Sequence, residues 1–296
     1  MISISAFPRC WIEKISNGEM SLFEWIDMSV QLECEGLELY SRFLTSHEPA
    51  YLADVRRRIE SLGMRVSMVC YAPDFTIPDA AARKKEVERQ KEMIRVTAAL
   101  GGGFCRTLSG QRRAGVSVPQ GVDWVVGCIE ACLPTAEAIG VKMAMENHYK
   151  DAFWEFPEFA QKSEVFLAIL DRIPSPHLGV QFDASNALVA GDDPVELLKR
   201  VIRRVITCHA SDRYLLPGTT IEEMRQADGT LGYPKNLHHG VIGRGMIDYD
   251  SVFRLFAAAD FNGWVSIEDG MNGMEEMKES VDFLKRMRRK YWGAPK

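Results

Sequence analysis

The stretch Lys142-Met-Ala-Met-Glu-Asn-His148 decides the fold of this chain, because its side chains alternate between two kinds of environment. In an extended strand Ala144, Glu146 and His148 share one face, and the two methionines share the other. Three later stretches follow the same pattern, each an apolar run that ends at an acidic or imidazole side chain. They are Leu178-Gly-Val-Gln-Phe-Asp183, Val205-Ile-Thr-Cys-His209 and Trp264-Val-Ser-Ile-Glu268.

Short apolar runs alternate with longer amphipathic segments along the whole chain. This alternation predicts an α/β fold, a (β/α)8 TIM barrel that forms a single domain over residues 1–296. A doubly wound open sheet is the alternative, but no Gly-x-Gly-x-x-Gly follows the first run. The expected strands are Ser3–Phe7, Gly36–Tyr40, Arg65–Tyr71, Gly103–Leu108, Lys142–His148, Leu178–Asp183, Arg204–His209 and Gly263–Glu268. The expected helices are Pro49–Leu62, Pro78–Leu100, Val122–Ile139, Pro157–Arg172, Pro194–Arg200, Tyr249–Ala259 and Met274–Tyr291.

One long stretch, Arg213–Arg244, shows no periodicity and is expected to be an irregular loop. It contains the turn-forming pairs Pro217-Gly218 and Asp228-Gly229. A loop of this length inside a compact domain is usually functional, as a lid or a partner surface. Because it follows the seventh strand, it lies on the face where barrels carry their active sites.

The composition is that of an ordinary globular enzyme, with 46% hydrophobic and 26% charged residues. A formal net charge of -5 argues against an extended phosphate-binding surface, so nucleic acid is not an expected partner. No apolar leader precedes the first strand, and no stretch reaches the roughly 18 apolar residues of a membrane span. The seven cysteines form no CxxC pair, so we expect reduced thiols. Together these features predict a cytoplasmic protein with no membrane partner.

Glu146, Asp183, His209 and Glu268 converge at one mouth if their strands are neighbours in a barrel. Each lies two residues after a small or polar side chain, so four separate strands have the same phase. Three carboxylates and one imidazole suit a divalent cation, with Mn²⁺ favoured and Mg²⁺, Co²⁺ and Zn²⁺ as alternatives. Each residue alone has a plainer interpretation, as a helix cap, a turn residue or a hydrogen-bonded core histidine.

Other side chains are expected around the same mouth. His148 is a candidate general base or substrate contact, with a structural histidine as the alternative. Arg106 and Arg213 are candidate contacts to an anionic or hydroxyl-rich ligand, although a salt bridge at the barrel rim explains Arg106 equally well. The remaining candidate substrate contacts are Asn186, His239 and Trp154, the last in an aromatic patch (Phe153, Trp154, Phe156) that can instead pack against a loop or subunit.

The motifs of the second half resemble the sugar isomerase and epimerase superfamily with the xylose-isomerase-like barrel. The resemblance implies that Glu146, Asp183, His209 and Glu268 hold a single catalytic cation. It also implies that Glu146 and Glu268 act as the acid/base pair, as in ketose 3-epimerases. Asn186 departs from the family, much of which has histidine there, and most ligands for the extra zinc ions of type IV apurinic endonucleases are missing. The motifs are Glu-Asn-His, Gly-x-x-x-Asp, Cys-His-x-Ser-Asp, Gly-x-Gly-x-Ile-Asp and Gly-Trp-Val-Ser-Ile-Glu.

By this resemblance we expect isomerisation or epimerisation of a ketose or oxo-sugar, by proton abstraction next to a metal-bound carbonyl and through an enediolate. The run Glu-Asn-His-Tyr-Lys-Asp and the aromatic segment after it are also similar to catalytic subunits of bacterial C-glycoside deglycosidases. That similarity implies the alternative, a lyase that cleaves 3-oxo-glycosides, with His148 as the base and a small β-rich subunit as partner. Otherwise the expected partners are a small sugar or glycoside and further copies of the chain. A metal-bearing barrel without catalysis is a third hypothesis.

Overall fold

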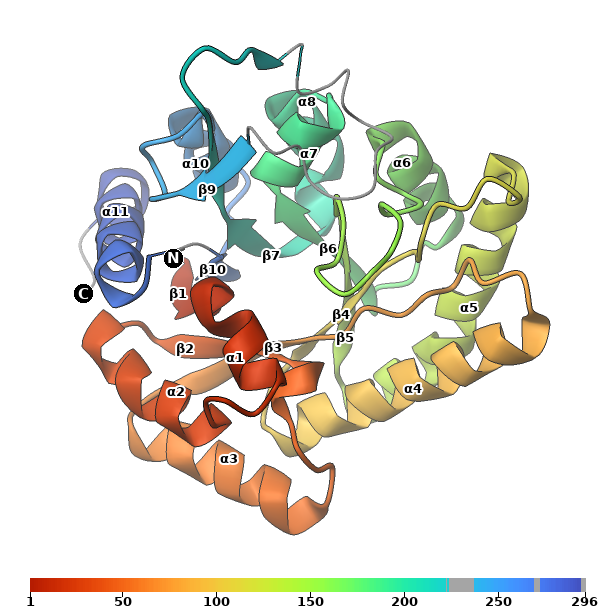
Figure 1. The fold of residues 1–296 in the computed structure, drawn as a ribbon, viewed down its shortest axis with the longest axis horizontal. Helices are drawn as coiled ribbons and strands as arrows, with labels where there is room; N and C mark the ends of the chain where they lie inside the picture. The colour runs from red at the N-terminus through yellow and green to blue at the C-terminus, as the bar shows by residue number, and fades with distance from the viewer. Residues whose placement is uncertain (222, 224–236, 269–271, 294–296) are drawn as a thin grey trace.

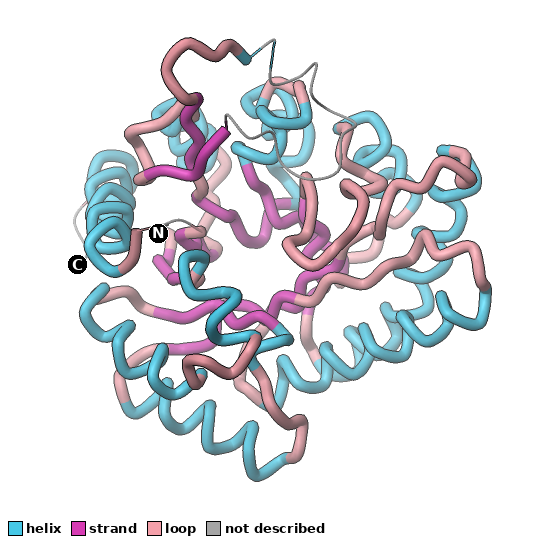
Figure 2. The backbone as a smooth tube through the Cα atoms, in the orientation of Figure 1, coloured by secondary structure: helices cyan, strands magenta, loops and turns pink. Residues whose placement is uncertain are grey.

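The structure is a computed structural model that describes residues 1–221, 223, 237–268 and 272–293. Its central strands are β1 (Ser3–Ala6), β2 (Gly36–Tyr40), β3 (Arg65–Cys70), β4 (Phe104–Thr107), β5 (Lys142–Glu146), β6 (Leu178–Asp183), β7 (Val205–Ala210) and β10 (Trp264–Ile267). They close into a parallel barrel in the order β1-β10-β7-β6-β5-β4-β3-β2, with helices around the outside (Figures 1 and 2). The predicted (β/α)8 barrel is confirmed.

The helices form the outer layer of this barrel. Three of them were not expected from the sequence, α1, α2 and α7, although Ser21 and Glu24 form a capping box at the start of α2. The helices are α1 (Ile12–Ser16), α2 (Leu22–Ser29), α3 (Pro49–Ser61), α4 (Ala80–Ala99), α5 (Val118–Ile139), α6 (Ser163–Arg172), α7 (Ala184–Ala190), α8 (Pro194–Val201), α10 (Tyr249–Ala258) and α11 (Met274–Trp292). Short 3-10 turns cover Arg9–Trp11, Val30–Leu32, Ser41–Phe43 and Ile202–Arg204.

The helix expected over Pro157–Arg172 begins only at Ser163. The backbone N–H groups of Glu158 and Phe159 are donated to the carbonyl oxygens of Tyr149 and Gly110 instead of starting a helical turn. Tertiary hydrogen bonds therefore override the local helical pattern and hold this segment against the barrel mouth.

The stretch expected as an irregular loop, Arg213–Arg244, is regular at both ends. Strand β8 (Asp212–Leu215) pairs antiparallel with β9 (Leu237–Gly240), and together they form an arm beside the barrel mouth (Figure 1). The buried carboxylate of Asp212 fixes the end of this arm by accepting N–H groups from Gly243, Gly245 and Ile247. Residue 222 and residues 224–236 of the stretch lie outside the described residues.

Strand register brings the candidate ligands side by side. Asp183 on β6 is opposite His209 on β7, and Ser266 on β10 is opposite the same His209. Glu268, which follows β10 directly, donates its backbone N–H to Ala210. The side chains that period-2 alternation places on the same face as the candidate ligands therefore face the interior of the barrel.

No helix in the described ranges is both long and apolar enough to cross a membrane. All seven cysteines are free thiols, as the sequence predicts, and six of them are buried. The cytoplasmic location stays a prediction.

Gly263, just before β10, packs closely against neighbouring residues, and a substitution there tests how much this packing contributes to stability. A methyl group at this position would lie 2.2 Å from the Ile206 carbonyl oxygen and 2.7 Å from the ring of Phe261. We expect Gly263→Ala to lower the free energy of unfolding by about 1–3 kcal/mol, measured in urea. The control Gly127→Ala, at an exposed position of α5 with nothing within 4 Å, should gain roughly 0.5–1 kcal/mol. Equal stability of Gly263→Ala and wild type would contradict this account.

Candidate functional site

The ends of four adjacent strands bring the predicted ligand side chains into one cluster. One ligand atom each from Glu146, Asp183, His209 and Glu268 lies within 4.8 Å of the others. His209 Nδ1 is 3.2 Å from Glu146 Oε1 and 3.4 Å from Glu268 Oε2. Glu146, Asp183 and His209 are buried, whereas 15% of the Glu268 side chain stays exposed. This spacing suits a single ion with mixed oxygen and nitrogen ligands.

The electrostatics of the cluster show that it is short of positive charge. Burial, with Glu268 and Glu146 nearby, raises the pKa of Asp183 to about 6. Burial also opposes ionisation of Glu146 and Glu268, but nearby positive groups together outweigh it and lower the pKa of both carboxyl groups. These groups are His209, His148 and Arg106 for Glu146, and His209, Arg9 and His239 for Glu268. In return these carboxylates and Glu38 overcome the effect of burial and raise the pKa of His209 well above its ordinary value. A divalent cation can replace the imidazole proton as the compensating charge, so the cluster fits such an ion.

Neighbouring groups hold Asp183 in place. Its Oδ1 accepts the N–H of Asn186 at 2.9 Å and so caps α7, and Ser211 Oγ donates to its Oδ2 at 3.1 Å. The Asn147 side chain donates to the Asp183 carbonyl at 2.6 Å and accepts its N–H at 2.9 Å. The capping role is therefore real, and it leaves the carboxylate inside the cluster.

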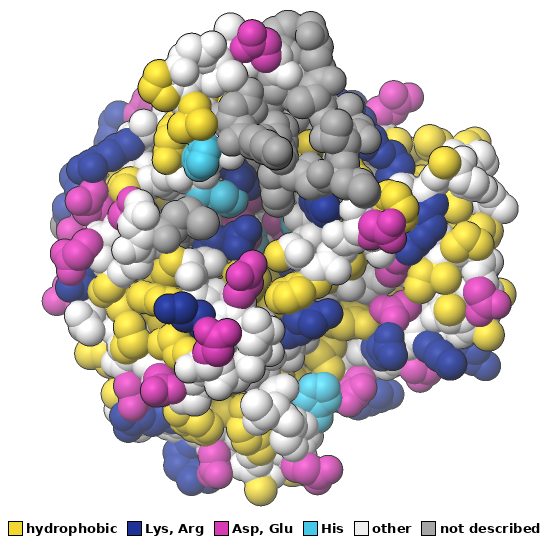
Figure 3. All heavy atoms as spheres, viewed as in Figure 1, with side chains coloured by type: hydrophobic (Ala, Val, Ile, Leu, Met, Phe, Trp, Pro, Cys, Tyr) yellow, Lys and Arg dark blue, Asp and Glu magenta, His cyan; other side chains and the backbone are white. Residues whose placement is uncertain are grey.

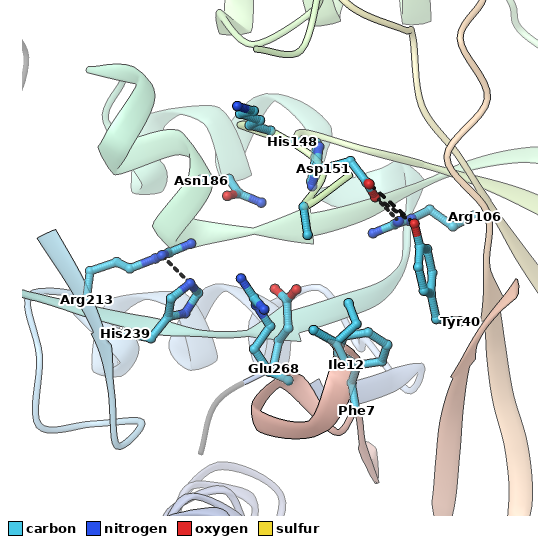
Figure 4. A pocket seen from close by; sticks show the side chains of 13 residues that line it. Phe7, Ile12, Tyr40, Arg106, His148, Asp151, Asn186, Arg213, His239 and Glu268 are labelled. Carbon is cyan, nitrogen blue, oxygen red and sulfur yellow. Dashed lines mark hydrogen bonds and ion pairs between the residues drawn. The ribbon is translucent and has the colours of Figure 1, made fainter. Parts of the chain in front are cut away.

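Arg106 forms the rim salt bridge that the sequence allowed. Its Nη1 donates to Glu146 Oε2 at 2.9 Å, and its Nη2 lies 3.4 Å from Asp151 Oδ2. Asp151 also accepts the hydroxyl of Tyr40 (Figure 4). Because one Glu146 oxygen is bound to a guanidinium, this carboxylate is less free to act as a base than Glu268.

A narrow pocket of about 30 Å³ opens above the cluster, and five of the predicted catalytic or substrate-contacting side chains besides Glu268 line it. Arg213 and His239 form a hydrogen-bonded pair on one side (Figure 4). Basic and imidazole side chains gather around the hollow on this face (Figure 3). The five predicted side chains that line the pocket are Arg106, His148, Asn186, Arg213 and His239.

Asn186 contacts a candidate ligand, whereas His148 contacts a further buried carboxylate. Asn186 Nδ2 is 3.3 Å from Glu146 Oε1. His148 Nδ1 is 3.3 Å from Glu158 Oε2, and the other oxygen of Glu158 accepts the backbone N–H of Ser109 at 2.7 Å. Burial lowers the pKa of His148, but Glu146 and Glu158 outweigh it and raise the pKa.

Trp154 does not line the inner pocket. It lies in an adjoining cleft of about 370 Å³ that shares Tyr40 and Asp151 with the inner pocket, and its ring meets that of His148 edge-on at 6.3 Å. Phe153, in the same cleft, stacks on Tyr40 at 6.0 Å. Trp154 therefore lies outside the inner pocket, and its contact to a substrate stays a prediction.

Three carboxylates at the site were not singled out by the sequence. Glu38, Asp151 and Glu158 are buried and contact His209, Arg106 and His148, respectively. For Glu38 a signal was present, because Gly36, Glu38 and Tyr40 alternate with two leucines in the predicted second strand. Asp151 and Glu158 lie between strand and helix, where no periodicity marks them.

With this geometry established, comparison with known families is decisive. The family described as Xylose isomerase-like TIM barrel matches residues 26–287. The chain belongs to this family.

Two curated relatives carry activities in their names. An inosose dehydratase of Clostridium botulinum is 28% identical over 90 residues, which is 29% of this chain and 28% of that protein. A 3-oxo-isoapionate decarboxylase of Pectobacterium atrosepticum is 22% identical over 205 residues, covering 69% of this chain and 61% of the relative. The chain thus matches less than two thirds of the length of either relative.

Solved structures share the fold over nearly the full length. A D-tagatose 3-epimerase-like protein superposes with a TM-score of 0.75 at 19% identity, covering 98% of both chains. The IOLI protein, described with a binding zinc atom, gives a TM-score of 0.73 at 16% identity and covers 99% of this chain and 100% of its own. At these identities the similarity supports the fold alone.

Asp183→Asn removes one charge from the cluster and keeps the oxygen that caps α7. In chelator-treated protein at neutral pH, we expect the free energy of unfolding of this variant to exceed that of wild type by about 1–3 kcal/mol. The reason is that a pKa raised to about 6 means that ionised Asp183 disfavours the folded state. Added Mn²⁺ should stabilise wild type by about 3 kcal/mol at a hundredfold excess over Kd and the variant by much less, measured as thermal unfolding.

The control is Asp193→Asn, at the exposed cap of α8, which should change neither quantity. An equal Mn²⁺ response of Asp183→Asn and wild type would rule out Asp183 as a ligand.

Proposed function

We propose that this protein is a divalent-cation-dependent enzyme that moves a proton at the carbon beside the carbonyl of a ketose or oxo-sugar, with isomerisation or epimerisation as the outcome. The observation that carries the proposal is the convergence of three carboxylates and one imidazole within 4.8 Å, at a pocket that His148 also lines. The relatives named for inosose and for a 3-oxo acid support a carbohydrate with a carbonyl as substrate.

The four clustered side chains, Glu146, Asp183, His209 and Glu268, would hold the cation. When bound, it would supply Lewis acidity toward substrate oxygens. The zinc atom named for the IOLI structure supports an ion in this fold, and Mn²⁺ is our choice of ion for this chain.

Glu268 and His148 are our candidates for proton transfer. They line the pocket from opposite sides, so one can remove a proton from a carbon while the other returns it (Figure 4). Glu158 faces His148 Nδ1, which leaves Nε2 to exchange the proton. Glu146, held by Arg106, is assigned to cation binding and not to the acid/base pair. Asn186, Arg213 and His239 would orient hydroxyl groups of the substrate.

A deuterium-exchange experiment tests this proposal. With Mn²⁺ in deuterated water, a panel of ketoses and 3-oxo-glycosides should yield at least one substrate that gains carbon-bound deuterium, detected by mass spectrometry and NMR. Glu268→Gln and His148→Gln should lower the exchange rate by roughly 10²–10⁴-fold. His47→Gln, at a surface ion pair with Glu92, should leave the rate unchanged. Exchange that continues at the wild-type rate in both site variants would exclude these roles.

A lyase on 3-oxo-glycosides, with a second β-rich subunit, is the other candidate. The adjoining cleft favours it, because an inner pocket of about 30 Å³ leaves a bulky substituent only the 370 Å³ cleft beside Tyr40 and Asp151. The names dehydratase and decarboxylase of the two relatives also favour bond cleavage after proton removal.

Product analysis separates the two candidates. Deuterium incorporation with the carbon skeleton and its substituents intact supports the isomerase or epimerase. Release of an aglycone or of water from the same incubation supports the lyase, and in that case Phe153→Ala should raise KM for a substrate with an aromatic substituent more than for one with a methyl group.

A further inference from the structure

We infer that Glu38 is a positioning residue that sets the tautomer and orientation of His209, so that Nδ1 faces the three candidate carboxylate ligands. This inference rests on the proposed function, because it concerns the same cation. Glu38 itself touches neither the pocket nor the substrate space, since its side chain is fully buried beneath the mouth.

Glu38 approaches the imidazole from the side away from the cluster. Its Oε1 lies 2.6 Å from His209 Nε2, a distance typical of a charge-assisted hydrogen bond. An acceptor at Nε2 requires a proton on that nitrogen, so the neutral ring keeps its lone pair on Nδ1. Nδ1 is the atom that lies 3.2 Å from Glu146 and 3.4 Å from Glu268. A carboxylate is one of the usual acceptors for the second ring nitrogen of a metal-binding histidine.

Two features of the chain aim Glu38 at this nitrogen, and a third restrains the imidazole ring. The register between β2 and β3 shifts between Leu37 and Glu38, and such an irregularity re-aims the side chain that follows it. The Cys70 thiol donates to the same Oε1 at 2.9 Å, which restrains the carboxylate from β3. The ring of Phe7 stacks on the imidazole at 6.3 Å and limits its rotation. The His209 ring is thus fixed by a carboxylate on one edge and an aromatic ring on its face.

An alternative role for Glu38 is that of a direct ligand to a second cation. Glu38, Cys70 and His209 also offer ligand atoms within 4.8 Å of one another, an arrangement able to hold another ion. The hydrogen bond from the Cys70 thiol to Glu38 favours a proton on sulfur, and a protonated thiol is a donor and not a metal ligand. We therefore assign Glu38 to the histidine and not to a cation, and cation stoichiometry distinguishes the two.

The test is a calorimetric titration of chelator-treated protein with Mn²⁺. Wild type should bind one equivalent, and Glu38→Gln should bind one equivalent about 10–100-fold more weakly, because a neutral amide is a poorer acceptor for the imidazole N–H. The control Glu35→Gln makes the same chemical change just before β2, where the carboxylate accepts the Ile4 N–H at 2.7 Å and contacts Arg288 at 2.8 Å. It should leave the affinity unchanged, and circular dichroism establishes that each variant is folded.

A second readout does not depend on affinity. In ¹⁵N-labelled protein loaded with Zn²⁺, long-range ¹H–¹⁵N correlations should place the His209 proton on Nε2 in wild type. A proton on Nδ1 would overturn the inference.

The outcomes separate the two proposals. Failure of wild type to bind Mn²⁺ would overturn the proposed function. Wild-type binding with an unchanged Kd in Glu38→Gln would overturn only the role of Glu38. Two equivalents in wild type and one in Glu38→Gln would also overturn that role, because Glu38 would then be a direct ligand.

Discussion

Mutual repulsion among buried carboxylates is the constraint on which the rest of this site depends. Two unit charges 4 Å apart repel by about 4 kcal/mol at an effective dielectric constant near 20, and three such groups lie within 4.8 Å of one another. The protein meets this repulsion with directed donors. Arg106 binds Glu146, Ser211 and the N–H of Asn186 bind Asp183, and His209 lies between Glu146 and Glu268. Burial and the repulsion from Glu268 and Glu146 still raise the pKa of Asp183, so these donors do not fully compensate for the two effects. The arrangement fits a divalent cation, which would supply the remaining positive charge.

The barrel satisfies the constraint because its geometry repeats. Parallel strands present every second side chain inward, and neighbouring strands carry their ends to the same mouth. A ligand on each of β6, β7 and β10 therefore needs only the correct phase and register, as the pairings Asp183–His209 and His209–Ser266 illustrate. Glu146, on β5, reaches the same point from the next strand along. Each ligand is positioned by a strand end and not by a long loop, which explains how side chains that repel one another stay close together.

Local patterns in the sequence were sufficient for the barrel and for the cluster. The eight barrel strands were predicted to within two residues at each end, because alternation and turn residues act over a few positions. The interactions that were missed are long-range ones. Glu38 meets His209 171 positions away, and Ser109 fixes Glu158 49 positions away. The helix expected from Pro157 failed for the same reason, since distant carbonyl groups take its first N–H groups. Metal identity, partners and substrate leave no local pattern, so they stay proposals.

The layer beneath the cluster explains how the barrel tolerates these charges. Barrel interiors are usually filled by branched apolar residues. Here Gln181, Thr207 and Ser266 lie two residues before the ligands of their strands, and Ser5 lies beside Ser266 on β1. Their buried polar atoms have no protein partner in the described ranges, which costs about 1–3 kcal/mol each unless ordered water satisfies them. These polar side chains also have a stabilising effect on the charged cluster.

This layer of polar side chains lowers the free-energy penalty for burying ionised carboxylates directly above it. An apolar layer would favour protonation of the carboxylates and weaken any cation site. The cost is confined to one face of the strands. The alternate positions Ile4, Val180, Cys208 and Val265 remain in the apolar core between the barrel and its helices. The chain therefore keeps its stability on the outer face of the barrel and uses the inner face for charge.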